Sequence, residues 1–272
     1  MSNEIKVLDK GFVRLIDHYG DDSTIVQSAR VSYGNGTKTK KEDRELLRYL
    51  VRHKHTSPLE QVEFRFHMKL PIFCARQLVR TRTANLNEIS GRYSIMKNEA
   101  YIPDKLKLQD TINRQGSIGR LDEDIENITI NNMYEEQESL FENYESYIKA
   151  GVCREQARIN LPLSTYTEWI WKMDLHNLFH FLGLRMHPHA QLEMQEYAEA
   201  IFELIKPIVP VSCEAFEDYR CGAGTFSKKE MDLLESIVKR EGDNDVLQYI
   251  QEEGFSGSKR ELKEFLKKLD LK

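Results

Sequence analysis

The chain has few of the features that mark secreted, zinc-stabilised or membrane-embedded proteins. It holds four cysteines in 272 residues, and these lie far apart without a CxxC pair. Such spacing excludes a zinc ribbon and a dense disulfide scaffold, so we expect reduced thiols. No apolar run approaches the ~18 residues of a membrane span, and the first residues lack the basic start and apolar stretch of a signal peptide. We therefore expect a cytoplasmic protein with no membrane partner.

Positive charge is not in excess either. The 39 Lys and Arg residues are outnumbered by 44 Asp and Glu, which gives a net charge of -5. A general nucleic-acid binder needs surplus Lys and Arg to neutralise phosphates, so we expect no nucleic-acid partner and only local anion sites. The hydrophobic content of 40% is sufficient for a buried core in a chain of this length.

Hydrophobic spacing predicts a mixture of helices and strands. Residues 61–70 alternate apolar and polar side chains, which is typical of a half-buried strand, and Pro71 suits the start of a helix directly after it. We expect a second strand at 164–172, an ordered loop at 81–103 and an irregular surface excursion at 104–133. Helices are predicted over 42–54, 72–80, 134–149 and 152–160, from an N-cap at Asp174, after Pro188, and as amphipathic helices from about 226.

Arginine and small polar residues concentrate between 76 and 93. Arg76 and Arg80 stand four apart, where like charges on one helical face repel and an anion would relieve the repulsion. A solvated arginine face is the alternative. Within a dozen residues the chain adds Glu88, Ser90 and Gly91, which suit a nucleotide phosphate and a polar base.

Three further segments carry polar groups. Arg154 and Arg158 precede a Leu-Pro pair, and by themselves favour surface ion pairs through Glu155. The segment 184–191 places one arginine and two histidines at a corner between helices, where a helix N-terminus would add affinity for anions. The segment 53–60 has two histidines, two hydroxyls and a carboxylate, although a loop that ends a helix explains it equally well.

Metal and serine-nucleophile chemistry are both disfavoured. Histidine pairs occur at 53/55, 176/180 and 187/189, but there is no HExxH motif and no cysteine ligand set, so we expect no metal site. Ser90 lacks an elbow motif such as GxSxG, which favours a binding role over a nucleophilic one.

The arginine segment resembles the signature of the flavin-dependent thymidylate synthases, which is Arg-His-Arg followed after seven residues by Ser. Here it stands as Arg80-Thr81-Arg82 and, after seven residues, Ser90. The likeness extends over about residues 5 to 220. Matching flanks lie at 29–32, 55–60, 75–77, 161–163, 184–185 and 189–191.

This resemblance implies an α+β fold with helices packed on a central, largely antiparallel sheet, assembled as a homotetramer with FAD between subunits. It implies a catalytic domain at 1–222 and a helical C-terminal extension at 223–272. The implied reaction methylates dUMP to dTMP, with 5,10-methylenetetrahydrofolate as carbon donor, FAD as hydride carrier and NADPH as reductant.

Matching positions imply roles for individual residues. Arg185 and Ser90 are expected to be catalytic. The residues expected to hold dUMP are Gln77, Glu88, Ser90, Gly91, Arg92, Arg158 and Arg185. Those expected to contact FAD are Ser32, His55, Ser57, Glu60, Arg80, Thr81, Arg82, His180 and His189. Thr81 departs from the signature histidine, so one imidazole contact to the flavin is missing.

Other classes of function remain open at this level. A nucleotide-binding or RNA-binding module could use the arginine segment without catalysis. A flavoprotein reductase with a different acceptor, or a family member inactivated by Thr81, would also carry these motifs.

Overall fold

The computed structural model describes residues 3–31, 40–111, 116–241, 248 and 258–268. The chain divides into two compact units, Met1–Gly222 and Ala223–Lys272, which are described separately. Within the described ranges, no helix is both long and apolar enough to cross a membrane.

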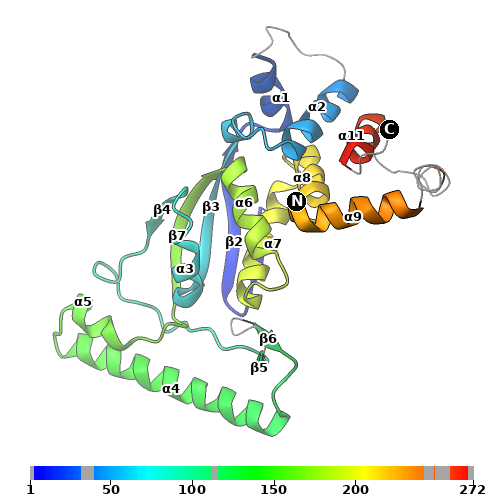
Figure 1. The fold of residues 1–272 in the computed structure, drawn as a ribbon. Helices are drawn as coiled ribbons and strands as arrows, with labels where there is room; N and C mark the ends of the chain where they lie inside the picture. The colour runs from blue at the N-terminus through cyan, green and yellow to red at the C-terminus, as the bar shows by residue number, and fades with distance from the viewer. Residues whose placement is uncertain (1–2, 32–39, 112–115, 242–247, 249–257, 269–272) are drawn as a thin grey trace. The chain divides into compact units, whose positions relative to one another are not determined.

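The first unit is built on a five-stranded sheet in the order β1-β2-β3-β7-β4, in which every neighbouring pair is antiparallel (Figure 1). Its strands are β1 (Glu4–Val7), β2 (Gly11–Tyr19), β3 (Glu63–Pro71), β7 (Tyr166–Asp174) and β4 (Asn85–Glu88). With helices packed against this sheet, the expected α+β class is confirmed.

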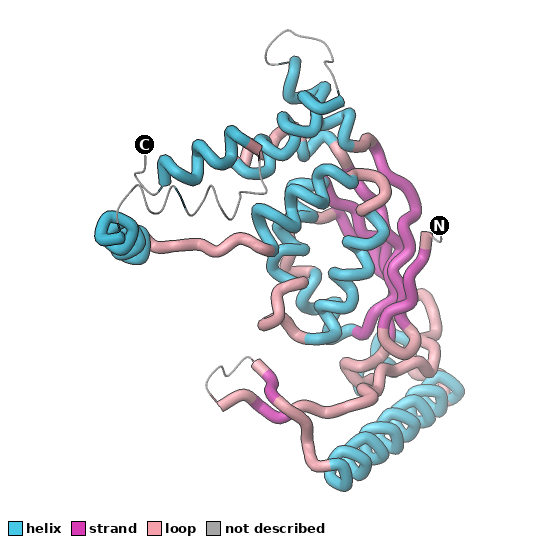
Figure 2. Tube along the Cα trace, turned by 90° about the vertical axis from the view of Figure 1, so that its right-hand side faces the viewer, coloured by secondary structure: helices cyan, strands magenta, loops and turns pink. Residues whose placement is uncertain are grey.

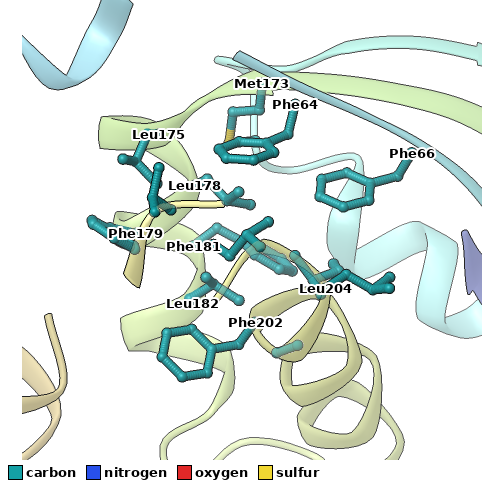
Figure 3. Close-up of a cluster of buried hydrophobic side chains, with 14 of the residues drawn as sticks. Phe64, Phe66, Met173, Leu175, Leu178, Phe179, Phe181, Leu182, Phe202 and Leu204 are labelled. Carbon is teal, nitrogen blue, oxygen red and sulfur yellow. The ribbon is translucent and has the colours of Figure 1, made fainter. Parts of the chain in front are cut away.

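The central strand β3 forms where alternation predicted it. Its apolar residues Phe64, Phe66 and Met68 are fully buried, and Phe66 lies opposite the buried Trp171 of β7. A slip of one residue would expose this whole apolar face, so burial determines the register. Helices α6 (Leu175–Arg185) and α7 (Leu192–Ile205) cover the face, and their side chains complete the core (Figures 2 and 3).

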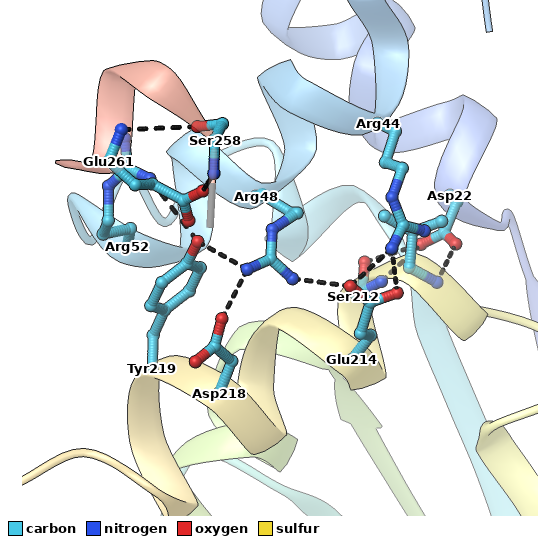
Figure 4. Close-up of polar contacts among 11 residues, drawn as sticks. Asp22, Arg44, Arg48, Arg52, Ser212, Glu214, Asp218, Tyr219, Ser258 and Glu261 are labelled. Carbon is cyan, nitrogen blue, oxygen red and sulfur yellow. Dashed lines mark hydrogen bonds and ion pairs between the residues drawn. The ribbon is translucent and has the colours of Figure 1, made fainter. Parts of the chain in front are cut away.

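A group of helices packs where β2 ends and β3 begins (Figure 1). It comprises α1 (Asp22–Val31), α2 (Lys40–Arg52), the 3-10 turn η1 (Leu59–Gln61), α8 (Pro210–Phe216) and the π-helical turn η3 (Glu217–Cys221). Helix α3 (Ile72–Leu78) instead follows directly from the other end of β3. Asp22 links α1 to α8, because its carboxylate accepts hydrogen bonds from Val211 N at 2.7 Å and from Ser212 Oγ at 2.6 Å (Figure 4). Burial raises the pKa of the Asp22 carboxyl above its ordinary value.

Two of the expected irregular segments are structured. The loop predicted at 81–103 contains strand β4, which pairs with β7 at the sheet edge. The surface excursion predicted at 104–133 is wrong in part, because it forms a short hairpin of β5 (Leu108–Gln109) and β6 (Ser117–Ile118) and then the start of a long helix.

That helix, α4, spans Glu123–Lys149 and so begins eleven residues before the predicted 134. Asp122 caps it by accepting from Asp124 N at 3.1 Å and Ile125 N at 3.4 Å. Most of α4 is solvated, and only Phe141 and Tyr144 are buried. The spacing of hydrophobic residues therefore did not reveal where α4 begins, whereas the N-capping residue Asp122 and the acidic first turn mark its start.

The remaining boundaries differ by a few residues. The helix predicted over 152–160 is split into α5 (Arg154–Ala157) and the 3-10 turn η2 (Arg158–Asn160), and the helix expected after Pro188 begins at Leu192. Asp174 caps α6 as predicted, with its Oδ1 3.0 Å from Asn177 N. Arg80 lies past the end of α3, so it does not share a helical face with Arg76.

The second unit contains α9 (Lys228–Glu241) and α11 (Lys259–Lys268), as the amphipathic spacing predicted. Both helices begin with a capping box. Ser227 N donates to Glu230 Oε2 at 2.6 Å, and Ser258 N donates to Glu261 Oε2 at 2.6 Å.

Candidate active site

Glu88 lies on the edge strand β4 and is held there by its neighbour strand. The hydroxyl of Thr167, a buried residue of β7, donates to Glu88 Oε1 at 2.6 Å. The backbone continues this pairing, because Ile89 N donates to Glu168 O at 2.9 Å. The carboxylate of Glu88 is therefore oriented while the residue stays exposed to a ligand.

A tight turn follows β4 and carries the next candidates. Ser90 O accepts hydrogen bonds from Tyr93 N and Ser94 N, both at 3.0 Å. Gly91 is buried, and a Cβ atom there would lie 2.9 Å from Arg158 Cδ and 3.0 Å from Arg158 Nη1. The absence of a side chain at Gly91 thus allows Arg158 to pack directly over the turn.

The turn and the segment of α5 and η2 are also linked by polar contacts. Arg92 Nε lies 3.0 Å from Glu155 Oε2, and Arg154 Nη1 donates to Tyr93 O at 2.6 Å. The ion pair expected for Arg158 through Glu155 is formed by Arg92 instead. Arg158 therefore approaches the turn with its guanidinium still available.

A second group of candidates surrounds the start of α7. Gln77 of α3 donates a hydrogen bond to Gln191, which itself donates to Glu193 Oε2 at 2.9 Å. Arg185 is the last residue of α6 and is half-buried. His189 stacks on His187 with ring centroids 5.0 Å apart.

A third group lines a cavity of about 240 Å³ between α2, α6 and α8. His55 and His180 lie on its wall, and its apolar surface includes Leu50, Phe179 and Phe216. His55 follows the end of α2 through Lys54, whose φ of 57° turns the chain sharply. The segment 53–60 is thus a helix-ending loop and also part of a cavity wall.

The other expected flavin contacts lie on exposed turns. Ser57 precedes η1 and Glu60 lies within it, and both are exposed. Arg80, Thr81 and Arg82 form the turn after α3, where Thr81 N donates to Leu78 O at 2.8 Å. Ser32 lies outside the described residues.

Several arginines among the candidate residues have no partner among the residues that the structure describes. In the described part of the chain, Arg80, Arg82, Arg158 and Arg185 form no ion pair or side-chain hydrogen bond, whereas Arg92 pairs with Glu155. Unpaired guanidinium groups beside a glycine turn can bind phosphate in bidentate fashion. Over the described ranges, no group of three or more His, Cys, Asp or Glu side chains could hold a metal ion.

The structure thus brings some of the predicted site residues together and leaves others separated. It brings Gly91 to Arg158, Gln77 to Gln191, and His55 to His180. Among the described residues, no side-chain hydrogen bond or ion pair connects the three groups to one another, although Arg185 and His180 share helix α6. Sequence reasoning missed Thr167, because its alternating strand gives no sign that a hydroxyl orients Glu88.

Known proteins resemble the chain over nearly its whole length. The family model described as thymidylate synthase complementing protein matches residues 14–211. The flavin-dependent thymidylate synthase of Treponema denticola is 53% identical, covering 88% of this chain and 91% of its own, and that of a Thermus thermophilus strain is 48% identical, covering 97% and 95%.

Among solved structures, a UMP/dUMP methylase PolB from Streptomyces cacaoi bound with 5-Br dUMP superposes with a TM-score of 0.72. It is 31% identical, and the match covers 79% of this chain and 98% of that one. The sequence matches, the shared fold and the arginine-glycine turn agree with one another, and the chain belongs to the flavin-dependent thymidylate synthase family.

Proposed function

We propose that this protein methylates dUMP to dTMP, with 5,10-methylenetetrahydrofolate as the carbon donor and NADPH as the reductant. The observation that carries the proposal is the unpaired guanidinium of Arg158 packed against Gly91, next to Glu88 and Ser90. This arrangement offers a phosphate clamp and a hydrogen-bonding edge within one short turn. Relatives about 50% identical that are named flavin-dependent thymidylate synthases support the same activity.

In this proposal, the turn after β4 binds and orients the nucleotide. Arg92 and Arg158 hold the phosphate, while Glu88, Ser90 and the Gly91 backbone position the sugar and base. Gln77 and Arg185 complete the dUMP site. Arginine at the uracil edge stabilises the negative charge that develops as C5 becomes nucleophilic, an effect worth about 3 kcal/mol in comparable sites.

The side chains present fit FAD. The cavity beside α6 combines apolar walls with imidazole groups, and none of the described residues that line it is an Asp or Glu, which suits a flat ring system joined to phosphates. When bound, FAD supplies the hydride that completes the methyl group. The residues that we propose to hold it are Ser32, His55, Ser57, Glu60, Arg80, Thr81, Arg82, His180 and His189.

We propose further that the active unit is a cytoplasmic homotetramer with FAD at its subunit interfaces. Two observations support shared sites. Among the described residues, no side-chain hydrogen bond or ion pair links the turn after β4 to the cavity beside α6, and apolar side chains are exposed around β4 and its turn, including Leu86, Ile89 and Tyr93. Exposed apolar side chains that gather near a site favour a protein interface. The catalytic residues then all belong to 1–222, with 223–272 as an extension.

The visible absorption spectrum of the purified protein tests this function. We expect an oxidised-flavin spectrum that NADPH bleaches under anaerobic conditions, faster with dUMP present than without it. Addition of methylenetetrahydrofolate should then yield dTMP, measured by chromatography, and UMP serves as the comparison substrate.

Other outcomes would redirect the assignment. Bleaching that is indifferent to dUMP, with no dTMP formed, would favour a flavoprotein reductase. No flavin after soaking in FAD, with dUMP still bound, would favour a nucleotide-binding module or a chain inactivated by Thr81.

A further inference from the structure

The cavity beside α6 contains a cationic residue that belongs to neither the arginine signature nor the family-matched segment. Arg220 lies in η3, after the end of the match at residue 211, and it lines the cavity together with His55 and His180. Lys54 and His176 line the same cavity, and among the described residues no Asp or Glu side chain does. The lining therefore favours an anionic ligand on charge alone.

The residues directly before Arg220 are anchored away from the cavity. Glu217 Oε1 accepts a hydrogen bond from Lys206 Nζ at 2.9 Å. Asp218 is paired with Arg48, and Tyr219 Oη accepts from Arg48 Nη2 at 2.8 Å (Figure 4). The guanidinium of Arg220, by contrast, forms no hydrogen bond or ion pair within the part of the chain that the structure describes. The turn is thus rigidly held while its one cavity-lining arginine remains available.

Backbone geometry at both walls supports a built site. η3 is a π-helical turn, a local distortion that frequently marks functional positions, and Gly222 N closes it by donating to Glu217 O at 2.8 Å. On the opposite wall, the left-handed conformation of Lys54 directs the chain from α2 into His55. Arg48 connects the two walls, because it reaches from α2 to Asp218 and Tyr219.

We propose that Arg220 binds the pyrophosphate of FAD in this cavity, as a positioning residue that adds affinity for the dinucleotide. The inference rests on the proposed flavin-dependent function. Phosphate is the part of FAD that a planar guanidinium grips best, while the apolar wall formed by Phe179 and Phe216, whose stacked rings are 4.5 Å apart, suits its aromatic portions.

Titration of flavin-free protein with riboflavin, FMN and FAD tests the assignment, because these ligands carry no, one and two phosphate groups. Binding is followed by the quenching of flavin fluorescence. Arg220→Ala should raise the Kd for FAD at least about tenfold, as loss of a charge-assisted hydrogen bond predicts, and leave the Kd for riboflavin within about twofold. Arg220→Lys should retain part of the FAD affinity.

Arg120 offers a matched control, since it is exposed and lies outside the cavity lining. Arg120→Ala should bind FAD as the wild type does. An unchanged FAD Kd in Arg220→Ala, or an equal loss for riboflavin, would overturn the assignment. Circular dichroism of each variant checks that the fold is retained.

The two proposals fail in distinguishable ways. If wild-type protein binds FAD but forms no dTMP from dUMP, the proposed reaction fails while the Arg220 titration still decides this inference. If wild-type protein binds no FAD at any salt concentration, the inference about Arg220 is overturned, and calorimetry with dUMP shows whether the nucleotide site survives.

Discussion

Arg185 combines a fixed position with an available charge. It ends α6, whose first turn is capped by Asp174, and the buried residues of that helix hold its axis against the sheet. The backbone of Arg185 is held in this way, and its guanidinium, unpaired among the described residues, is available to contact a bound ring on which charge develops. The residue therefore suits stabilisation of a transition state more than binding of the flavin.

We expect Arg185→Ala to lower kcat by about 100-fold or more, because removal of one preorganised donor has that effect in comparable sites. The Kd for FAD should change by far less. Steady-state turnover and flavin fluorescence measure the two quantities separately. A variant that loses both in equal proportion would argue for a structural role, and Arg185→Lys provides the charge-conserving comparison.

Because Gly91 has no side chain, the Arg158 side chain can pack directly against the turn after β4. We expect Gly91→Ala to displace the Arg158 side chain, since the new Cβ would lie 2.9 Å from its Cδ, and to raise the Kd for dUMP about five- to tenfold. Calorimetry with dUMP is the measurement.

Gly224→Ala is the matched control for that change, because a Cβ at Gly224 meets no atom within 4 Å. It should bind dUMP normally. If Gly91→Ala did so too, while Arg158→Ala weakened binding, the close packing of the turn would be irrelevant to the site.

At the scale of elements, Arg48 connects α2 to both α8 and η3. Arg48 is largely buried, with 16% of its side chain exposed, and donates to Glu214 Oε1 at 2.6 Å and Tyr219 Oη at 2.8 Å. Its guanidinium also lies over the Tyr219 ring, 4.9 Å from the centroid. These contacts of Arg48 hold α2 against α8 and η3, and all three elements contribute residues to the lining of the cavity beside α6.

We expect Arg48→Met to lower the free energy of unfolding by about 2 kcal/mol, because Asp218 and Tyr219 lose a partly buried partner. FAD affinity should fall as well, since η3 would lose the contacts that Asp218 and Tyr219 make with Arg48. Urea denaturation followed by circular dichroism measures the first effect.

Arg44→Met removes the more exposed arginine from the same Glu214 carboxylate, with 48% of its side chain exposed. Its cost should stay below about 1 kcal/mol. An equal loss of unfolding free energy in Arg48→Met and Arg44→Met would show that Arg48 contributes no more to stability than Arg44 does.

At the scale of the whole molecule, the four cysteines report on the integrity of the core. All are free thiols, with Cys74 and Cys213 buried and Cys153 and Cys221 exposed. Burial raises the pKa of the Cys74 and Cys213 thiols far above the ordinary value, so these two stay protonated and unreactive while the protein is folded.

We expect a thiol reagent at a mildly alkaline pH to modify two cysteines in the native protein and all four after unfolding in guanidinium chloride. Burial and the nearby Glu217 carboxylate raise the pKa of Cys221, so it should react more slowly than Cys153, and its rate should increase with pH. Absorbance of the released chromophore gives the count, and Cys153→Ser identifies the fast phase. Rapid modification of all four thiols in the native protein would contradict the burial of Cys74 and Cys213.

Local patterns were informative wherever neighbouring residues decide the structure. Alternation predicted β3 because burial on one face of a strand follows from every second residue, and Asp174 was recognisable as a cap because its hydrogen bond reaches only to Asn177. The start of α4 was missed, because a solvated helix has no apolar period and its Asp122 cap lay within a polar stretch.

By itself, the sequence determined the α+β class, the central strand, the helix capped by Asp174 and, through Arg80, Thr81, Arg82 and Ser90, the family. Only the tertiary structure decided that Arg158 lies over Gly91, that Thr167 orients Glu88, and that Arg220 lines the cavity with His55. Those contacts join segments far apart in the chain. They depend on how the strands pair and how the helices pack. The residue pattern within a single segment determines neither the strand pairing nor the helix packing.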